Sequence, residues 1–161
     1  MSAFTGPLVI EEVQPGRRWR LREPIRYEAG REGSGHWIVV PAGTETDGAS
    51  IPAALRLILA VWGSYGRAAC IHDYLYRIIR TGEQIVTDER GFDLSHRDFG
   101  AARSAGVNLA DPRAARRWAD DEFYTAMRAC GTSRGLAFMI WATVRLFGAR
   151  YCRPSDPVTR A

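Results

Sequence analysis

The sequence contains no lysine, so all 22 of its basic side chains are arginines. A GC-rich genome explains this usage most simply, whereas the functional alternative is recognition of phosphate or carboxylate groups by planar guanidinium groups. The net charge of +4 is compatible with an anionic partner. The arginines are scattered, however, and no nucleic-acid-binding motif accompanies them, so we rank nucleic acid last among the partners considered.

Cysteine is also scarce, and Cys70, Cys130 and Cys152 lie far apart without a C-x-x-C pair. This spacing favours reduced intracellular thiols over a disulfide framework. The N-terminus lacks both a basic region and a sustained apolar run, so we expect no signal peptide. The longest apolar run, residues 136–144, is too short for a transmembrane segment. Because that run is apolar on all sides, it predicts a buried helix, with an interfacial membrane helix as the alternative.

The chain of 161 residues, with 46% hydrophobic and 25% charged residues, is long and apolar enough for one domain with its own core. We therefore expect residues 1–161 to form a single domain. Its first part, residues 1–45, contains short apolar or alternating runs separated by glycine and proline, which predict an antiparallel meander. These runs are residues 8–10, 19–22, 25–27 and 37–40.

A helical part, residues 50–148, follows the strands. Capping and proline signals predict helices that begin at Ser50, Ser64, Asp111 and Ser133. A polar, glycine-containing insertion, residues 81–111, interrupts them, and residues 149–161 are expected to form an extended tail. The prediction is an α+β fold in which a small N-terminal antiparallel sheet packs against three or four C-terminal helices.

His72 and Asp73 form the only His-Asp dipeptide, and they lie inside an apolar helical run. A titratable pair in such a place needs partners. Helical spacing puts His72 on the inward stripe with Leu75 and Tyr76, and it puts Asp73 about 100° further round. Taken alone, the pair favours a structural interpretation: a buried histidine satisfied by a carboxylate, and Asp73 paired with Arg77.

Two further carboxylates are candidates to meet this pair. Asp47 lies in a turn at a strand-to-helix junction, where turn and cap chemistry would also explain it. Asp120 lies at the border of the buried stripe of the helix that starts at Asp111, where it could bridge to neighbouring arginines. If Asp120 contacts His72 instead, it fixes the imidazole tautomer and leaves the other ring nitrogen free as a base.

Several motifs together resemble a known group of proteins. They are residues 40–43 (VPAG), 46–52 (TDGASIP), 72–76 (HDYLY), 119–120 (AD) with Phe123, and 144–148 (VRLFG). In this order they resemble the small uncharacterised proteins encoded in tailed bacteriophage and prophage genomes, often among structural genes. The resemblance covers about residues 37–148. It implies synthesis in the bacterial cytoplasm, incorporation in the virion and contact with other tail proteins, but no established reaction. The insertion at 81–111 departs from the compact pattern of that group.

A second resemblance is local. The pattern consists of Cys70, His72, Asp73 and Tyr76. It is similar to the active-site helix of secreted phospholipases A2, which implies that His72 activates water and that Asp120 with Tyr76 steadies it. It also implies that Asp73 holds a calcium ion, or another divalent cation, that polarises the ester carbonyl. The chain lacks the disulfide framework and multi-glycine calcium loop of those enzymes, and Asp47 is the nearest substitute for a second ligand.

The sequence leaves two functions open. In the first, the protein is a structural or accessory component of the phage tail or tail tip, and His72, Asp73, Asp120 and Asp47 form a buried polar cluster. In the second, it is a hydrolase in which His72 is the general base for cleavage of a lipid ester or a peptidoglycan bond. An enclosed imidazole with both nitrogens bonded within the protein favours the first function. A solvent-reaching cleft in which His72, Asp120 and Asp47 meet, with one acceptor position unfilled, favours the second.

Overall fold

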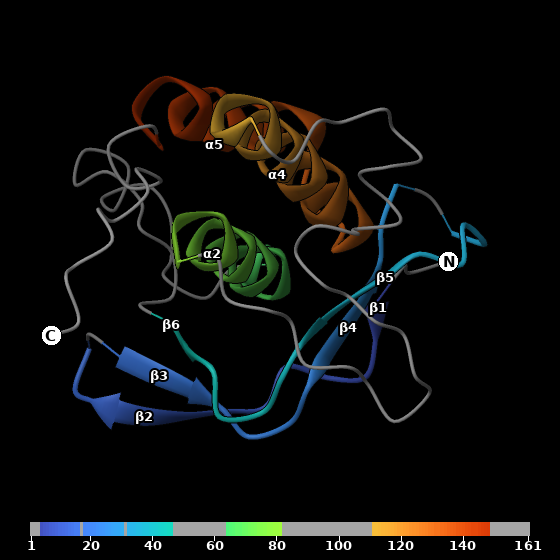
Figure 1. Cartoon of the computed structure of the whole chain (residues 1–161). Coiled ribbons are helices and arrows are strands. Elements are labelled where there is room, and N and C mark those ends of the chain that lie inside the picture. Colours follow the sequence, from blue (N-terminus) through green and yellow to red (C-terminus); the bar gives the residue numbers. More distant parts are fainter. Residues whose placement is uncertain (1–3, 17, 31, 47–63, 82–110, 149–161) are drawn as a thin grey trace, which may run out of the picture.

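The computed structural model describes residues 4–16, 18–30, 32–46, 64–81 and 111–148. In these residues strands come first and helices follow, which confirms the α+β class (Figure 1). The strands are β1 (Phe4–Thr5), β2 (Ile10–Gln14), β3 (Arg18–Leu21), β4 (Ile25–Glu28), β5 (Trp37–Val40) and β6 (Glu45–Thr46). The helices are α2 (Gly66–Thr81), α4 (Pro112–Ala129) and α5 (Arg134–Phe147). The helix expected from Ser50, the tail 149–161 and nearly all of the insertion 81–111 lie outside the described residues.

The described strands form two antiparallel sheets, ordered β1-β4-β5 and β2-β3-β6, so the single meander expected from the sequence is wrong. The chain passes from one sheet to the other three times, at residues 6–9, 22–24 and 41–44. Each of these segments contains a proline (Pro7, Pro24 and Pro41), which cannot donate a ladder hydrogen bond and so suits a place where the chain leaves a sheet. At the third crossing Gly43 has a φ of 83° and donates its N–H to the carbonyl of Leu21 at 2.8 Å. Glycine adopts that backbone conformation at little cost.

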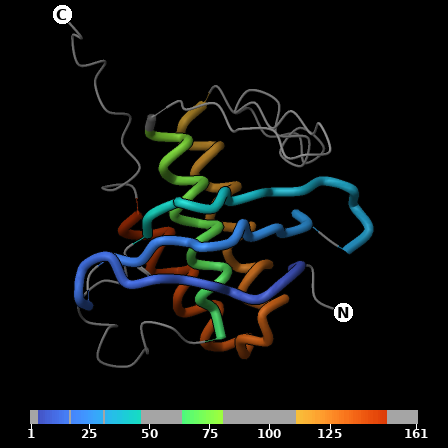
Figure 2. The backbone as a smooth tube through the Cα atoms, turned by 90° about the horizontal axis from the view of Figure 1, so that it is seen from below, coloured from blue at the N-terminus to red at the C-terminus, as the bar shows by residue number. Residues whose placement is uncertain are grey.

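Helix α2 lies between the strands and the other two helices (Figure 1). It contacts β4 and β5 on one side and α4 on the other, and α4 in turn contacts α5. Figure 2 shows α2 and α4 running alongside each other. One hydrophobic core joins these layers, with Tyr27 and Val40 from the strands, Ile71 and Leu75 from α2, and Met127 from α4. Burial of each of these side chains contributes roughly 1.5–3 kcal/mol.

Local cap chemistry determines where the last two helices begin, as the sequence predicts. The side chain of Asp111 accepts a 2.9 Å hydrogen bond from the N–H of Arg113, and Pro112 occupies the first helical position. Ser133 caps α5 by accepting from the N–H of Leu136 at 3.4 Å. Helix α2 begins at Gly66, so Tyr65 and not Ser64 stands at its cap position, where the Tyr65 carbonyl accepts the N–H of Ala69 at 2.9 Å. The hydroxyl of Ser64 lies 3.2 Å from that of Thr132, and the predicted cap is wrong by one residue.

Helix α5 is not the buried helix that its composition predicts. Only Ala137 and Ile140 of this helix are buried, while four large apolar side chains remain exposed: Phe138, Met139, Leu146 and Phe147. Within the described residues, no helix combines the length and apolar character needed to cross a membrane.

Candidate functional site

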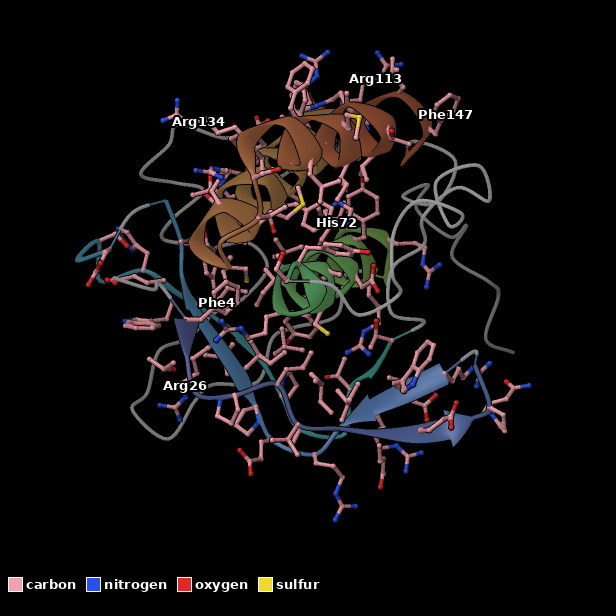
Figure 3. All side chains as sticks on the ribbon, turned by 180° about the vertical axis from the view of Figure 1, so that it is seen from behind. Phe4, Arg26, His72, Arg113, Arg134 and Phe147 are labelled. Carbon is pink, nitrogen blue, oxygen red and sulfur yellow. The ribbon has the colours of Figure 1, made fainter. Side chains whose placement is uncertain are left out.

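The imidazole of His72 lies between α2 and α4, where Figure 3 shows it facing the helical layer. Its ring stacks on Phe123 of α4 with 4.5 Å between centroids, and it contacts the ring of Tyr76 at 4.1 Å. Only 8% of the side chain is exposed. The inward direction that helical periodicity predicts is confirmed, and two aromatic rings fix the plane of the imidazole.

The carboxylate of Asp120 is fully buried and joins two residues of α2. Its Oδ1 lies 3.1 Å from Nε2 of His72 and accepts a 2.5 Å hydrogen bond from the hydroxyl of Tyr76. Because a carboxylate accepts, the tautomer that satisfies this contact carries its proton on Nε2. Among the described residues, the Nδ1 atom of His72 has no hydrogen-bond partner, so its lone pair is not used by them.

Two arginines neutralise the other side of the same carboxylate. Arg116, one turn earlier on α4, places Nη1 at 3.3 Å from Oδ2 of Asp120, and Arg145 of α5 places Nε at 3.5 Å. A buried carboxylate is costly unless charged partners and hydrogen bonds compensate it. With these four partners Asp120 is compensated, and its cluster contains groups from all three described helices.

Sequence reasoning gave Arg116 as a neighbour of Asp120 but assigned no role to Arg145. The signal was present, since Arg145 lies in the 144–148 motif. Its contacts depend on how α5 is turned against α4, because it also donates to the carbonyl of Arg117 at 3.1 Å and pairs with Asp121. Local periodicity does not determine that orientation.

The three consecutive acids 120–122 take three different directions because each step along a helix turns by about 100°. Asp120 points to His72, and Asp121 accepts a 3.0 Å hydrogen bond from the indole N–H of Trp141. Glu122 accepts from the N–H of Gly30 at 3.1 Å and from the hydroxyl of Tyr27 at 3.3 Å. Burial raises the pKa of the Glu122 carboxyl above its ordinary value of 4.5. Glu122 therefore joins α4 to the end of β4, away from His72.

The end of α5 closes against the hydroxyl of Tyr76. A Cβ atom built on Gly148 would lie 2.5 Å from that hydroxyl, so a residue with a side chain cannot occupy this position without movement. Gly148 has a right-handed φ of −63°, so close approach rather than backbone conformation is the reason for glycine here. The 144–148 motif thus provides both Arg145 and the glycine that abuts Tyr76.

Asp73 points away from this cluster. Its Oδ2 accepts a 2.6 Å hydrogen bond from the hydroxyl of Thr46 in β6, which ties α2 to the second sheet. The guanidinium of Arg77, the partner expected for Asp73, lies over the ring of Tyr74 at 5.4 Å. The structure therefore brings His72, Tyr76 and Asp120 together and leaves Asp73 on another face of α2.

The calcium site implied by the local resemblance has no complete ligand set in the described part of the chain, where no three histidine, cysteine or acidic side chains converge. Calcium needs about six to eight oxygen ligands. A cation beside Asp120 would also face the positive charges of Arg116 and Arg145. Asp47, the second expected ligand, lies outside the described residues, so a metal site at Asp73 and Asp47 stays a prediction.

Cys70 is not suited to act as a nucleophile. Its thiol is buried, and burial together with the charge of Asp73 raises the pKa of Cys70 to about 12. Because the thiolate is the reactive form, this thiol is inert near neutral pH. Of the described groups around His72, the imidazole itself is the one whose chemistry suits proton transfer.

The comparisons with known proteins gave one match. A family model described as "Protein of unknown function (DUF1353)" matches residues 19–144. No curated protein and no solved structure matches the chain. The matched range includes His72, Tyr76, Arg116 and Asp120, and it ends one residue before Arg145. Since the model covers well over half of the sequence, the chain belongs to the family of proteins of unknown function DUF1353.

Proposed function

We propose that this protein is a hydrolase in which Nδ1 of His72 is the general base. The observation that carries the proposal is that the two imidazole nitrogens differ in their hydrogen bonding. Nε2 is hydrogen-bonded to Asp120, whereas no described residue bonds to Nδ1. A positioned imidazole whose other nitrogen is held by a carboxylate is the arrangement that activates water or a hydroxyl in many hydrolases. A purely structural histidine gives no reason for an Nδ1 atom that has no hydrogen-bond partner among the described residues.

The proposed step follows from these contacts. Nδ1 accepts a proton from a water molecule while that water attacks the carbonyl carbon of an ester. The imidazolium that forms is stabilised by the carboxylate of Asp120, and Tyr76 and the two arginines hold that carboxylate in place. The proton is then available to the leaving alkoxide, which completes hydrolysis to an acid and an alcohol. Asp120 and Tyr76 are positioning residues in this scheme.

The resemblances described above define the substrates and the setting to be tested. The similarity to the phospholipase A2 helix supports a lipid ester as substrate. The similarity to phage and prophage proteins supports a role at the bacterial envelope and makes peptidoglycan the competing substrate. We propose that the protein acts from the virion, in contact with other tail proteins.

The test compares the wild type with His72→Asn on phospholipid vesicles and on purified peptidoglycan, with added calcium, with added zinc and with a chelator. His36→Asn is the matched control, because His36 belongs to the turn before β5 and not to the Asp120 cluster. We expect hydrolysis by the wild type and the control, and a loss of roughly 10²–10⁴-fold in His72→Asn. Absence of wild-type activity on both substrates under every metal condition would refute the proposal.

A second candidate, a structural virion protein, is favoured by one specific observation. The cluster around Asp120 is buried and joins α2, α4 and α5, as expected of a polar network that stabilises the packing of these helices. Under this proposal His72→Asn lowers the unfolding temperature and the yield of infectious particles, although the wild type hydrolyses nothing. Mass spectrometry of purified virions gives the direct check, since a protein that is absent from them has no structural role there.

A further inference from the structure

The outward side of α5 carries large apolar side chains that remain exposed in the described part of the chain. We call Phe138, Met139, Leu146 and Phe147 the α5 face; their exposed fractions are 57%, 48%, 73% and 52%. At about 100° per residue, Phe138, Met139 and Leu146 fall within a single arc of about 100°, and Phe147 extends it at the end of the helix. Four such residues on one helix are more than the isolated exposed apolar side chains of an ordinary surface.

Positive charge flanks this face. Arg134 is exposed at the start of α5, and Arg113 and Arg117 are exposed on the neighbouring helix α4. Figure 3 shows Arg113, Arg134 and Phe147 at the outer edge of the α4–α5 layer, directed away from the body of the molecule. Of the described residues of α4 and its cap, the two exposed acids are already engaged: Asp111 caps α4, and Asp121 is paired with Arg145 and Trp141.

We propose that the α5 face docks on an anionic lipid bilayer surface. Helices that lie in a membrane interface present phenylalanine, leucine and methionine to the acyl chains, with arginines beside them for the phosphate headgroups. Trp141 adds an amphipathic ring on the flank of the face. Its ring is tilted against that of Phe138, with 5.6 Å between centroids, and its N–H donates to Asp121. Tryptophan in this arrangement is typical of the boundary between lipid and water.

A second copy of the chain is the less favourable occupant on electrostatic grounds. A symmetric pair would bring the same flanking arginines of each copy toward each other, and each chain has a net charge of +4. An anionic bilayer supplies the opposite charge together with an apolar layer. The charge on this side therefore favours lipid over self-association.

The face is also continuous with the His72 cluster through the last turn of α5. Leu146 and Phe147 lie between Arg145, which contacts Asp120, and Gly148, which abuts the hydroxyl of Tyr76. A bilayer on the α5 face would thus lie next to residues that contact Asp120 and Tyr76. The docking proposal nevertheless does not rest on catalysis, because binding to lipid is measured separately from hydrolysis.

The test is flotation of the full-length protein with vesicles of phosphatidylglycerol and phosphatidylcholine, compared with vesicles of phosphatidylcholine alone. The variant Phe138→Ser/Leu146→Ser removes two exposed side chains, and Val13→Ser is the matched control because Val13 is 40% exposed on a strand. We expect salt-sensitive binding to the anionic vesicles, a loss of about tenfold or more in the double variant, and none in the control. Arg113→Gln/Arg134→Gln should weaken binding at low salt.

The outcomes separate this proposal from the proposed function. His72→Asn should bind vesicles like the wild type, and loss of binding in that variant with its fold intact would overturn the assignment to α5. No binding of the wild type to anionic vesicles at low salt would also overturn it. So would a dimer, measured by analytical ultracentrifugation, that dissociates in the double variant, because a second copy would then be the occupant.

Discussion

The hydroxyl of Tyr76 and the imidazole of His72 share one oxygen of Asp120, at 2.5 Å and 3.1 Å. The two donors are one helical turn apart on α2, and the acceptor comes from α4, 44 residues further along the chain. A single buried oxygen thus sets both the tautomer of His72 and the distance between two helices. Changes at either donor should therefore affect stability and, under the proposed function, activity.

Tyr76→Phe removes one of these bonds and leaves the ring in place. Hydrogen bonds to charged groups contribute about 1.5–3 kcal/mol, so the free energy of unfolding should fall by about that amount. Urea denaturation gives the measurement. Tyr124→Phe on α4 is the control, because the hydroxyl of Tyr124 has no hydrogen bond among the described residues, and it should change stability by less than about 0.5 kcal/mol. Equal losses in both variants would contradict the prediction.

Asp120→Asn should lower the free energy of unfolding more than a substitution of either donor, His72 or Tyr76. The substitution keeps the shape but leaves the guanidinium groups of Arg116 and Arg145 facing a neutral amide in a buried place. Breaking one partner of a buried ion cluster costs about 3–5 kcal/mol. Asp121→Asn is the adjacent control: its side chain is 60% exposed, so its ion pair should contribute less than about 1 kcal/mol. Equilibrium unfolding that ranks the two variants the other way would refute the role given to Asp120.

The parts that local chemistry determines could be predicted from the sequence. Asp111 followed by proline, and Ser133 after a glycine, indicated the starts of α4 and α5 because caps act on the adjacent backbone. Helical periodicity also placed His72 and Asp73 on different faces of one helix. In the structure His72 contacts Asp120 of α4, and Asp73 contacts Thr46 of β6.

Long-range arrangement could not be predicted in the same way. The apolar runs of the first 45 residues indicated strands, but strand alternation does not tell which strands pair, and the chain forms two sheets instead of one meander. The rotation of α5 against α4, which brings Arg145 to Asp120 and exposes Phe138, is likewise set by packing between helices. For this reason the apolar composition on all sides of α5 predicted a buried helix, whereas one side of α5 is exposed in the structure.

Glu122 should make stability fall as pH rises. Its pKa in the folded protein is raised, chiefly by burial, above the ordinary value of 4.5 that applies to the unfolded chain. Between these two values the folded state binds more protons than the unfolded state, so this contribution to stability is present below pH 4.5 and is lost as pH rises through the folded pKa. Glu122→Gln should remove that decline. Urea denaturation of both proteins from pH 4 to 8 gives the difference, and parallel curves would contradict the prediction.

Gly148→Ala tests how closely α5 closes over the site. The added methyl group would lie 2.5 Å from the hydroxyl of Tyr76, so either the ring or the end of α5 has to move. Overpacking of this kind costs about 1–3 kcal/mol, and displacement of the hydroxyl from Asp120 should add the loss seen in Tyr76→Phe. Gly135→Ala is the matched control on the same helix, because a methyl group there meets nothing within 4 Å and should stabilise α5 by up to about 1 kcal/mol. If thermal unfolding shows both alanines to be neutral or stabilising, the contact between Gly148 and Tyr76 does not constrain the site. If Gly148→Ala is destabilising in the wild type but nearly neutral in a Tyr76→Phe background, the hydroxyl is the group that requires glycine.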